Sequence, residues 1–117
     1  MYSGVRGIFQ AVLGAALLAV QPALARIEFG APPAKAEATI GCMYPMTGRG
    51  GLYGRDSVAA IELALAEIAT RPDGRPRLRV LIEDTKSRPS QGASVAQGFI
   101  EKDRVQFLCG VVSSAVA

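Results

Sequence analysis

Short apolar runs alternate with segments of helical periodicity, and this alternation limits the folds open to the chain. Each run is bounded by turn residues such as Pro45 and predicts a buried strand. Each intervening segment places apolar side chains three and four positions apart, which is typical of an amphipathic helix. Strands that alternate with helices form a parallel sheet with right-handed crossovers. The predicted fold class is therefore α/β, a partial doubly wound parallel sheet in the order β-α-β-α-β. The predicted strands span 39–43, 78–82 and 105–112, and the predicted helices span 57–71 and 89–100.

Local chemistry sets the expected helix boundaries. Asp56 or Ser57 can cap the first helix, because their side-chain oxygens accept backbone N–H groups that have no partner within the helix. Pro72 ends that helix, since the residue before a proline avoids helical geometry. Pro89 suits the first position of the second helix. After the third strand, Ser113 and its neighbour are predicted to begin a further helix.

The N-terminal segment has the three parts of a secretory signal peptide. Arg6 supplies positive charge, residues 11–20 are apolar, and small residues at 23 and 25 form an A-x-A cleavage pattern. A membrane anchor, the alternative, needs about 20 apolar residues, whereas glutamine and proline at 21–22 end this run. We therefore expect a signal peptide over 1–25, cleavage after Ala25 and a periplasmic location.

Residues 26–38 contain a proline pair and mixed charge, so an irregular lead-in is expected before a domain over 39–117.

Composition excludes several classes of function for the remainder of the chain. The formal net charge is only +3, and no basic stretch is interleaved with aromatic residues, which argues against nucleic-acid binding. Because the chain has no histidine, a Ser-His-Asp triad is excluded and a zinc site has no support.

The two cysteines, Cys42 and Cys109, both lie inside apolar runs. Buried thiols act as small hydrophobic side chains, and an exported protein can also pair its cysteines. We expect two buried thiols, and a disulfide is the alternative.

The glycine-rich segment 44–57, YPMTGRGGLYGRDS, follows the first strand as phosphate-binding loops do. A dinucleotide fingerprint needs G-x-G-x-x-G, but Tyr53 occupies the third glycine position. A P-loop needs a lysine after its glycines, and none follows here. Glu83 or Asp84 ends the second strand, which keeps a Rossmann-like oxidoreductase domain as an alternative. These two carboxylates point to opposite faces of a strand, so a catalytic dyad is not expected.

The succession of these motifs resembles the opening of the periplasmic substrate-binding proteins of branched-chain amino acid ABC transporters, the leucine-binding protein family. The matching stretches are YPMTGRGGLYGRDS with the helix VAAIELALAEIA, and LRVLIEDTKSRPSQGASVAQGFIEKDRVQFLCGVVSS. The likeness covers roughly residues 39–117. Family members have two α/β lobes of the type I periplasmic binding fold, joined by a hinge. The resemblance implies an N-terminal fragment that holds the first part of lobe 1.

The resemblance also implies a function and a site. Family members bind a small solute such as an amino acid or amide, without a cofactor, a metal or an enzymatic step, and deliver it to an ABC transporter permease. Ser114, with Ser113 beside it, matches the family's serine that holds the ligand carboxylate, and a helix N-terminus favours an anion. Tyr53 matches an aromatic residue near the ligand side chain. Helix capping and loop packing are the alternative roles.

One residue departs from the pattern of that family, and one further function remains open. Arg88 stands where the family often has an aspartate before the helix proline, so this helix cap is altered. A sensor or receptor ectodomain with the same binding fold is a second alternative function.

Overall fold

A computed structural model describes residues 26–117, so the predicted signal peptide lies outside the described residues. The described chain forms four strands, two α-helices and two short 3-10 helices. In chain order they are β1 (Ile27–Gly30), η1 (Pro33–Lys35), β2 (Ala38–Tyr44), η2 (Gly48–Gly50), α1 (Gly51–Ala69), β3 (Leu78–Asp84), α2 (Pro89–Glu101) and β4 (Phe107–Gly110). Among these residues, no helix is long and apolar enough to cross a membrane.

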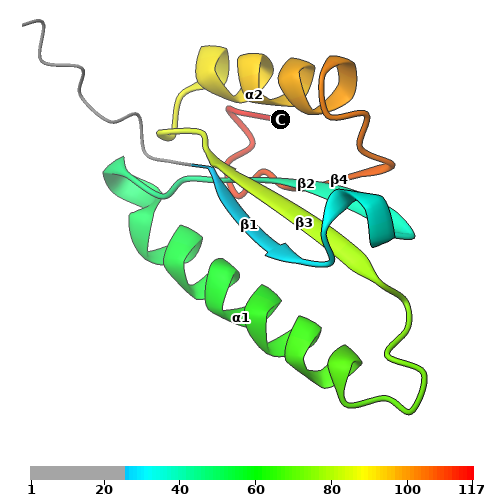
Figure 1. The fold of residues 1–117 in the computed structure, drawn as a ribbon. Coiled ribbons are helices and arrows are strands. Elements are labelled where there is room, and N and C mark those ends of the chain that lie inside the picture. Colours follow the sequence, from blue (N-terminus) through cyan, green and yellow to red (C-terminus); the bar gives the residue numbers. More distant parts are fainter. Residues whose placement is uncertain (1–25) are drawn as a thin grey trace, which may run out of the picture.

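The four strands form one sheet in the order β1-β3-β2-β4. The pairs β2–β3 and β2–β4 are parallel. This confirms the predicted parallel sheet and its β-α-β-α-β connectivity. Figure 1 shows α1 on one side of the sheet and α2 on the other, so the connections wind around both faces as in a doubly wound fold.

Strand β1 corrects the expectation of an irregular lead-in. Ile27–Gly30 pairs antiparallel with β3, and Ile27 lies opposite Ile82. Ile27 and Phe29 pack against the apolar cluster of Cys42, Val80 and Ile82. The alternation of apolar and polar residues in IEFG is the period of a half-buried strand, and the proline pair that follows it concealed this signal.

Two apolar clusters hold the helices to the two faces of the sheet. On one face, Val58, Ile61 and Leu65 of α1 pack against the cluster around Ile82. On the other face, Val95 and Phe99 of α2 pack against residues of β2 and β3. The Phe99 side chain is fully buried.

Glycine in β2 makes room for the Phe99 ring. A methyl group placed on Gly41 would lie only 2.6 Å from Phe99 Cδ2. The absence of a side chain at this position therefore lets the aromatic ring lie directly on the strand, which couples α2 to the centre of the sheet.

Helix α1 begins at Gly51, six residues before the predicted start at Ser57. Gly51 and Gly54, two of the glycines that suggested a loop, belong to α1, because its first turns lie against the preceding segment. A methyl group on Gly54 would lie 2.4 Å from the carbonyl oxygen of Pro45. The Ser57 hydroxyl donates to the Tyr53 carbonyl at 2.7 Å, inside the helix, so the predicted cap at Asp56 or Ser57 is wrong.

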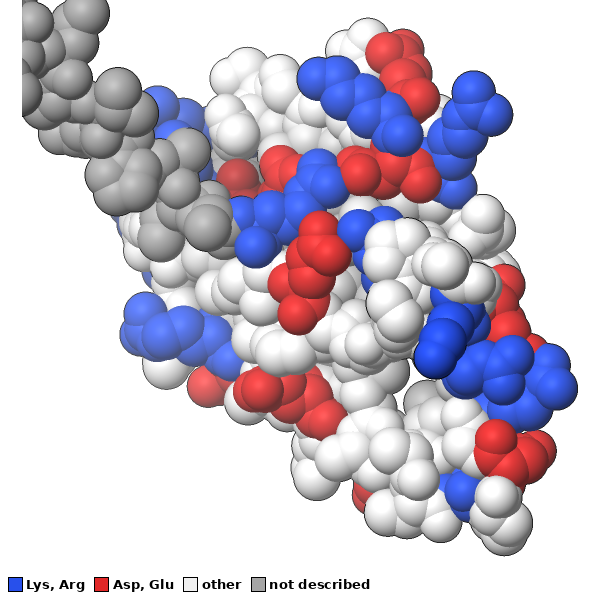
Figure 2. All heavy atoms as spheres, in the orientation of Figure 1, with Lys and Arg blue, Asp and Glu red and all other residues white. Residues whose placement is uncertain are grey.

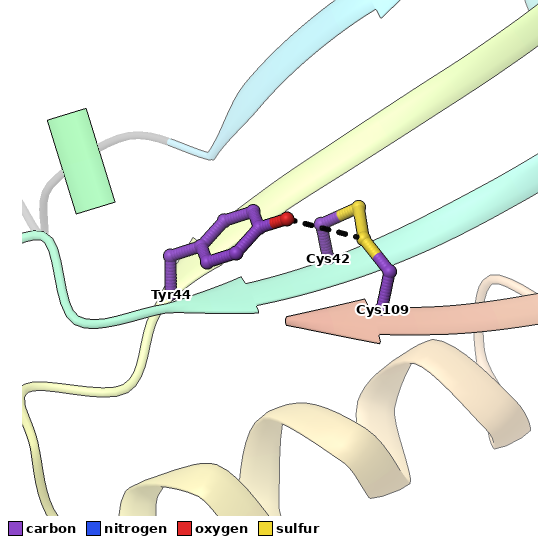
Figure 3. Close-up of a disulfide and its surroundings, with 3 residues drawn as sticks. All are labelled: Cys42, Tyr44 and Cys109. Atoms are coloured by element: carbon purple, nitrogen blue, oxygen red, sulfur yellow. Dashed lines mark hydrogen bonds between the residues drawn. A yellow bond between two sulfur atoms is a disulfide. The ribbon is translucent and has the colours of Figure 1, made fainter. Parts of the chain in front are cut away.

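The cysteines form a disulfide, and the expectation of two separate thiols is wrong. Cys42 of β2 and Cys109 of β4 are direct partners across the parallel pair, with their Cα atoms 4.5 Å apart. That separation lies within the range for a bridge. Figure 3 shows the bridge between the two strands with the Tyr44 side chain beside it, and the Tyr44 hydroxyl lies 3.6 Å from Cys109 Sγ.

Candidate functional site

The three parallel strands all end at one side of the sheet, which we call the carboxyl edge. The segments that follow them are residues 45–50 after β2, 85–88 after β3 and 111–116 after β4. In open α/β sheets, ligands bind outside the carboxyl ends of the strands. These three segments therefore form the candidate site, and Figure 1 shows them on the left of the molecule.

Asp84, the last residue of β3, holds the first two segments in place. Its carboxylate accepts hydrogen bonds from the backbone N–H groups of Met46 at 2.9 Å and Thr47 at 3.3 Å. It also accepts one from the Thr47 hydroxyl at 2.6 Å and one from the Lys86 backbone N–H at 2.7 Å. The shape of the segment after β2 thus depends on one side chain at the end of β3.

The charge state of Asp84 is set by opposing effects. Partial burial raises the pKa of the carboxyl, but the hydrogen bonds from Thr47, Lys86 and Met46 lower it by more, so its pKa lies below the ordinary value for aspartate. Its contribution to stability is therefore fully present above the unfolded-state pKa and is lost as the pH falls through the folded-state pKa.

Replacing this carboxylate should expose that dependence. We expect Asp84→Asn to lower the free energy of unfolding by about 1–2 kcal/mol at neutral pH, since an amide cannot replace all four acceptor contacts. The difference from wild type should shrink below about pH 4. Urea denaturation of both proteins between pH 3 and 7 measures it. A difference that stays constant across this range would show that the carboxylate charge does not hold the loop. Asp73→Asn, in an exposed turn at the other end of the sheet, is the matched control.

The first two segments also lie side by side. A methyl group on Gly48 would lie 3.6 Å from the Lys86 carbonyl oxygen and 3.6 Å from Ser87 Oγ. Gly48 has φ 81°, in the left-handed region that glycine adopts without strain. The glycines therefore let the segment after β2 turn beside the segment after β3. They do not form the G-x-G-x-x-G fingerprint of a dinucleotide-binding loop, which the sequence lacks.

The third segment leaves β4 through a strained turn. Gly110 has φ 101° and Val111 has φ 62°, and the Val111 backbone N–H donates to the Met43 carbonyl at 2.9 Å. A β-branched residue with positive φ is an outlier, and such strain clusters at ligand sites. No local pattern of the sequence indicates this turn.

The predicted site residues lie at the carboxyl edge, in the parts of the chain that follow two different strands. Tyr53 is in the first turn of α1, after β2, and its side chain is 62% exposed. Ser113 and Ser114 follow β4, the direct neighbour of β2. Neighbouring parallel strands thus bring Tyr53 and the serines to one edge.

Residues 113–116 form a turn and not the predicted helix start. The Val116 backbone N–H donates to the Ser113 carbonyl at 2.9 Å, and the Ala115 N–H donates to the Ser113 hydroxyl at 3.3 Å. The Ser113 hydroxyl therefore serves the turn. Ser114 is exposed, which leaves it as the better placed of the two to meet a ligand.

A hollow of about 300 Å³ lies elsewhere, near the amino end of β3. Ile68, Pro76 and Leu78 are among the residues that line it. Its walls offer few converging polar groups, which ligand sites usually contain. Within residues 26–117, no group of three or more acidic or cysteine side chains is placed to hold a metal ion.

The sequence profile of the family described as periplasmic binding protein matches residues 37–117. The chain belongs to the periplasmic binding protein family. Its sheet is a partial lobe of the type I periplasmic binding fold. A solved ABC transporter substrate-binding protein from Sphaerobacter thermophilus matches it with a TM-score of 0.61 and 30% sequence identity. The curated proteins contain no significant match.

That match covers 68% of this chain and 21% of the Sphaerobacter protein. The chain therefore spans about a fifth of the length of this relative. The described residues supply the carboxyl edge of one lobe.

Proposed function

We propose that the chain belongs to an exported solute-binding component of an ABC importer, which binds an amino acid, an amide or a similar small organic solute. In this proposal Ser114 and nearby backbone N–H groups hold a negative group of the solute, and Tyr53 contacts its side chain. A second lobe would enclose the solute by hinge closure. The protein would then meet an ABC transporter permease, with no cofactor and no chemical step.

The observation that supports this proposal most is the convergence of the three segments at the carboxyl edge. Asp84 holds the first two through hydrogen bonds, and the hydrogen bond from the Val111 N–H to the Met43 carbonyl holds the start of the third. A site that is already rigid before the ligand arrives loses less entropy on binding. Exposed Tyr53 and Ser114 lie on this supported framework.

The Rossmann-like alternative loses its one supporting feature. In that fold, an acidic residue at the end of the second strand binds the ribose hydroxyls. Here the Asp84 carboxylate is occupied by the segment after β2, because it accepts hydrogen bonds from Met46, Thr47 and Lys86. We therefore favour solute binding over nucleotide binding.

Replacing Ser114 tests the proposed site. In the complete gene product, we expect Ser114→Ala to weaken solute binding roughly tenfold, because the hydroxyl donates to a charged group of the solute. Isothermal titration calorimetry measures the dissociation constant. Ser94→Ala is the matched control, since the exposed Ser94 hydroxyl donates only to the Ser90 carbonyl within α2. Equal affinities for wild type and Ser114→Ala would remove Ser114 from the site.

A further inference from the structure

Four cationic side chains surround the carboxyl edge, and we infer that the solute bound there is an organic anion. This inference rests on the proposed function and narrows its solute class. The four residues, which we call the cationic rim, are Arg49, Arg55, Lys86 and Arg88. All four side chains are exposed.

The rim cations come from two segments that lie in contact. Arg49 is in η2, and Arg55 is in the first turns of α1. Lys86 and Arg88 follow β3, and Asp84 holds the two segments side by side, because its carboxylate accepts hydrogen bonds from Met46, Thr47 and Lys86. Figure 2 shows Lys and Arg side chains at two places on the left of the molecule, the side on which Figure 1 places the carboxyl ends of the strands.

At the opposite edge of the same sheet, some cations are paired and others, such as Lys102 and Arg104, form no ion pair among the described residues. There Arg75 and Arg77 both form ion pairs with Glu37. On the outer strand pair, Arg79 lies 2.9 Å from a carboxylate oxygen of Glu28. Across the part of the chain that the structure describes, none of the four rim cations forms such an ion pair. Their positive charge is therefore available to a ligand.

Three carboxylates lie near the rim and do not cancel it. Glu83, the neighbour of Asp84 in β3, forms an ion pair with Arg26, and the other two are Asp84 and Asp56. The Asp84 carboxylate is already engaged within the chain, because it accepts hydrogen bonds from Met46, Thr47 and Lys86. Asp56 is exposed on α1 beside Arg55. Four cations against Asp84 and Asp56 leave the rim with a net positive charge.

This charge distribution predicts which solute binds more tightly. A cleft lined by one sign of charge raises the local concentration and the association rate of ions of opposite charge. Arginine is suited to carboxylates because its guanidinium donates two parallel hydrogen bonds. A neutral amide gains nothing from the positive charge of the rim, and a zwitterionic amino acid gains less than an anion because its ammonium group is repelled. The geometry thus favours small carboxylates with a net negative charge, including acidic amino acids.

Matched pairs of solutes test the charge preference in the complete gene product. Titration calorimetry would compare glutamate with glutamine and succinate with succinamide, at about 20 mM and about 300 mM salt. We expect the anionic member of at least one pair to bind about tenfold more tightly at low salt, and high salt to reduce this preference.

A pair of double variants separates the rim from the overall charge of the protein. Lys86→Gln/Arg88→Gln removes two rim cations, and Lys102→Gln/Arg104→Gln removes the same two residue types from the segment between α2 and β4. We expect the first variant to lose about tenfold in affinity for the anion, with little change for its neutral partner. The second variant should bind both solutes like wild type.

The remaining outcomes of these experiments would all contradict the inference. Tighter binding of glutamine or succinamide, or equal losses in the two double variants, would overturn the inference and leave the proposed function intact. Binding of none of the four solutes would also overturn the inference, and the wider proposal of solute binding, which includes other amino acids and amides, would remain.

Discussion

Removing the Cys42–Cys109 disulfide is expected to lower the free energy of unfolding by about 2–5 kcal/mol. The bridge joins residues 67 positions apart and closes a loop that contains α1, β3 and α2. Without it, the unfolded chain gains conformational freedom, so the folded state becomes relatively less stable. Guanidinium denaturation of Cys42→Ala/Cys109→Ala beside wild type measures the loss.

Reduction provides a second readout without a change of sequence. Wild type treated with a reductant should move toward the denaturation midpoint of the double variant, while the double variant should not respond. If the reductant leaves the denaturation midpoint of wild type unchanged, the bridge is absent from the folded protein or adds nothing to its stability.

Truncating Phe99 should have an effect of similar size. We expect Phe99→Ala to cost about 3–5 kcal/mol, because the fully buried ring lies on Gly41 of β2 and its loss leaves a cavity. The neighbouring Ile100 is 56% exposed on the same helix. Ile100→Ala is therefore the matched control and should cost less than about 1 kcal/mol. Equal losses for the two variants in a thermal melt would show that α2 does not pack as described.

The order of the elements was predictable because periodicity is a local property of the sequence. The apolar runs gave β2, β3 and β4, and the spacing of Val95 and Phe99 gave α2. Strand β1 was missed because the proline pair that follows it concealed the short alternation in IEFG, and because its partner strand around Ile82 lies far away in sequence. The early start of α1 was missed because its glycines are there for the close approach to Pro45, a contact that no local pattern encodes.

The disulfide and the hydrogen bonds of Asp84 both depend on how the strands pair. Cys42 faces Cys109 because β2 and β4 pair with one particular offset, which also aligns Ile40 with Phe107. A one-residue shift would have separated the two sulfur atoms. Similarly, the position of Asp84 at a strand end was visible in the sequence, but its hydrogen bonds to the segment after β2 required the folded structure.

The candidate site was predictable in its location and less so in its details. Topology places Tyr53 and Ser114 after neighbouring parallel strands, so the shared edge follows from the predicted sheet. The positive φ of Val111 accompanies its hydrogen bond to Met43, which lies far away in sequence. The turn at 113–116 is closed by hydrogen bonds to Ser113, where the sequence predicted the start of a helix.

Chemical-shift mapping tests most directly whether a solute binds at the carboxyl edge. Backbone amide shifts of the complete gene product would be followed by NMR while glutamate is added, with any other solute that binds as a further probe. We predict that the largest changes within this chain lie at residues 47–54 and 111–116. Changes concentrated instead around residues 68–78, at the opposite end of the sheet, would contradict the account.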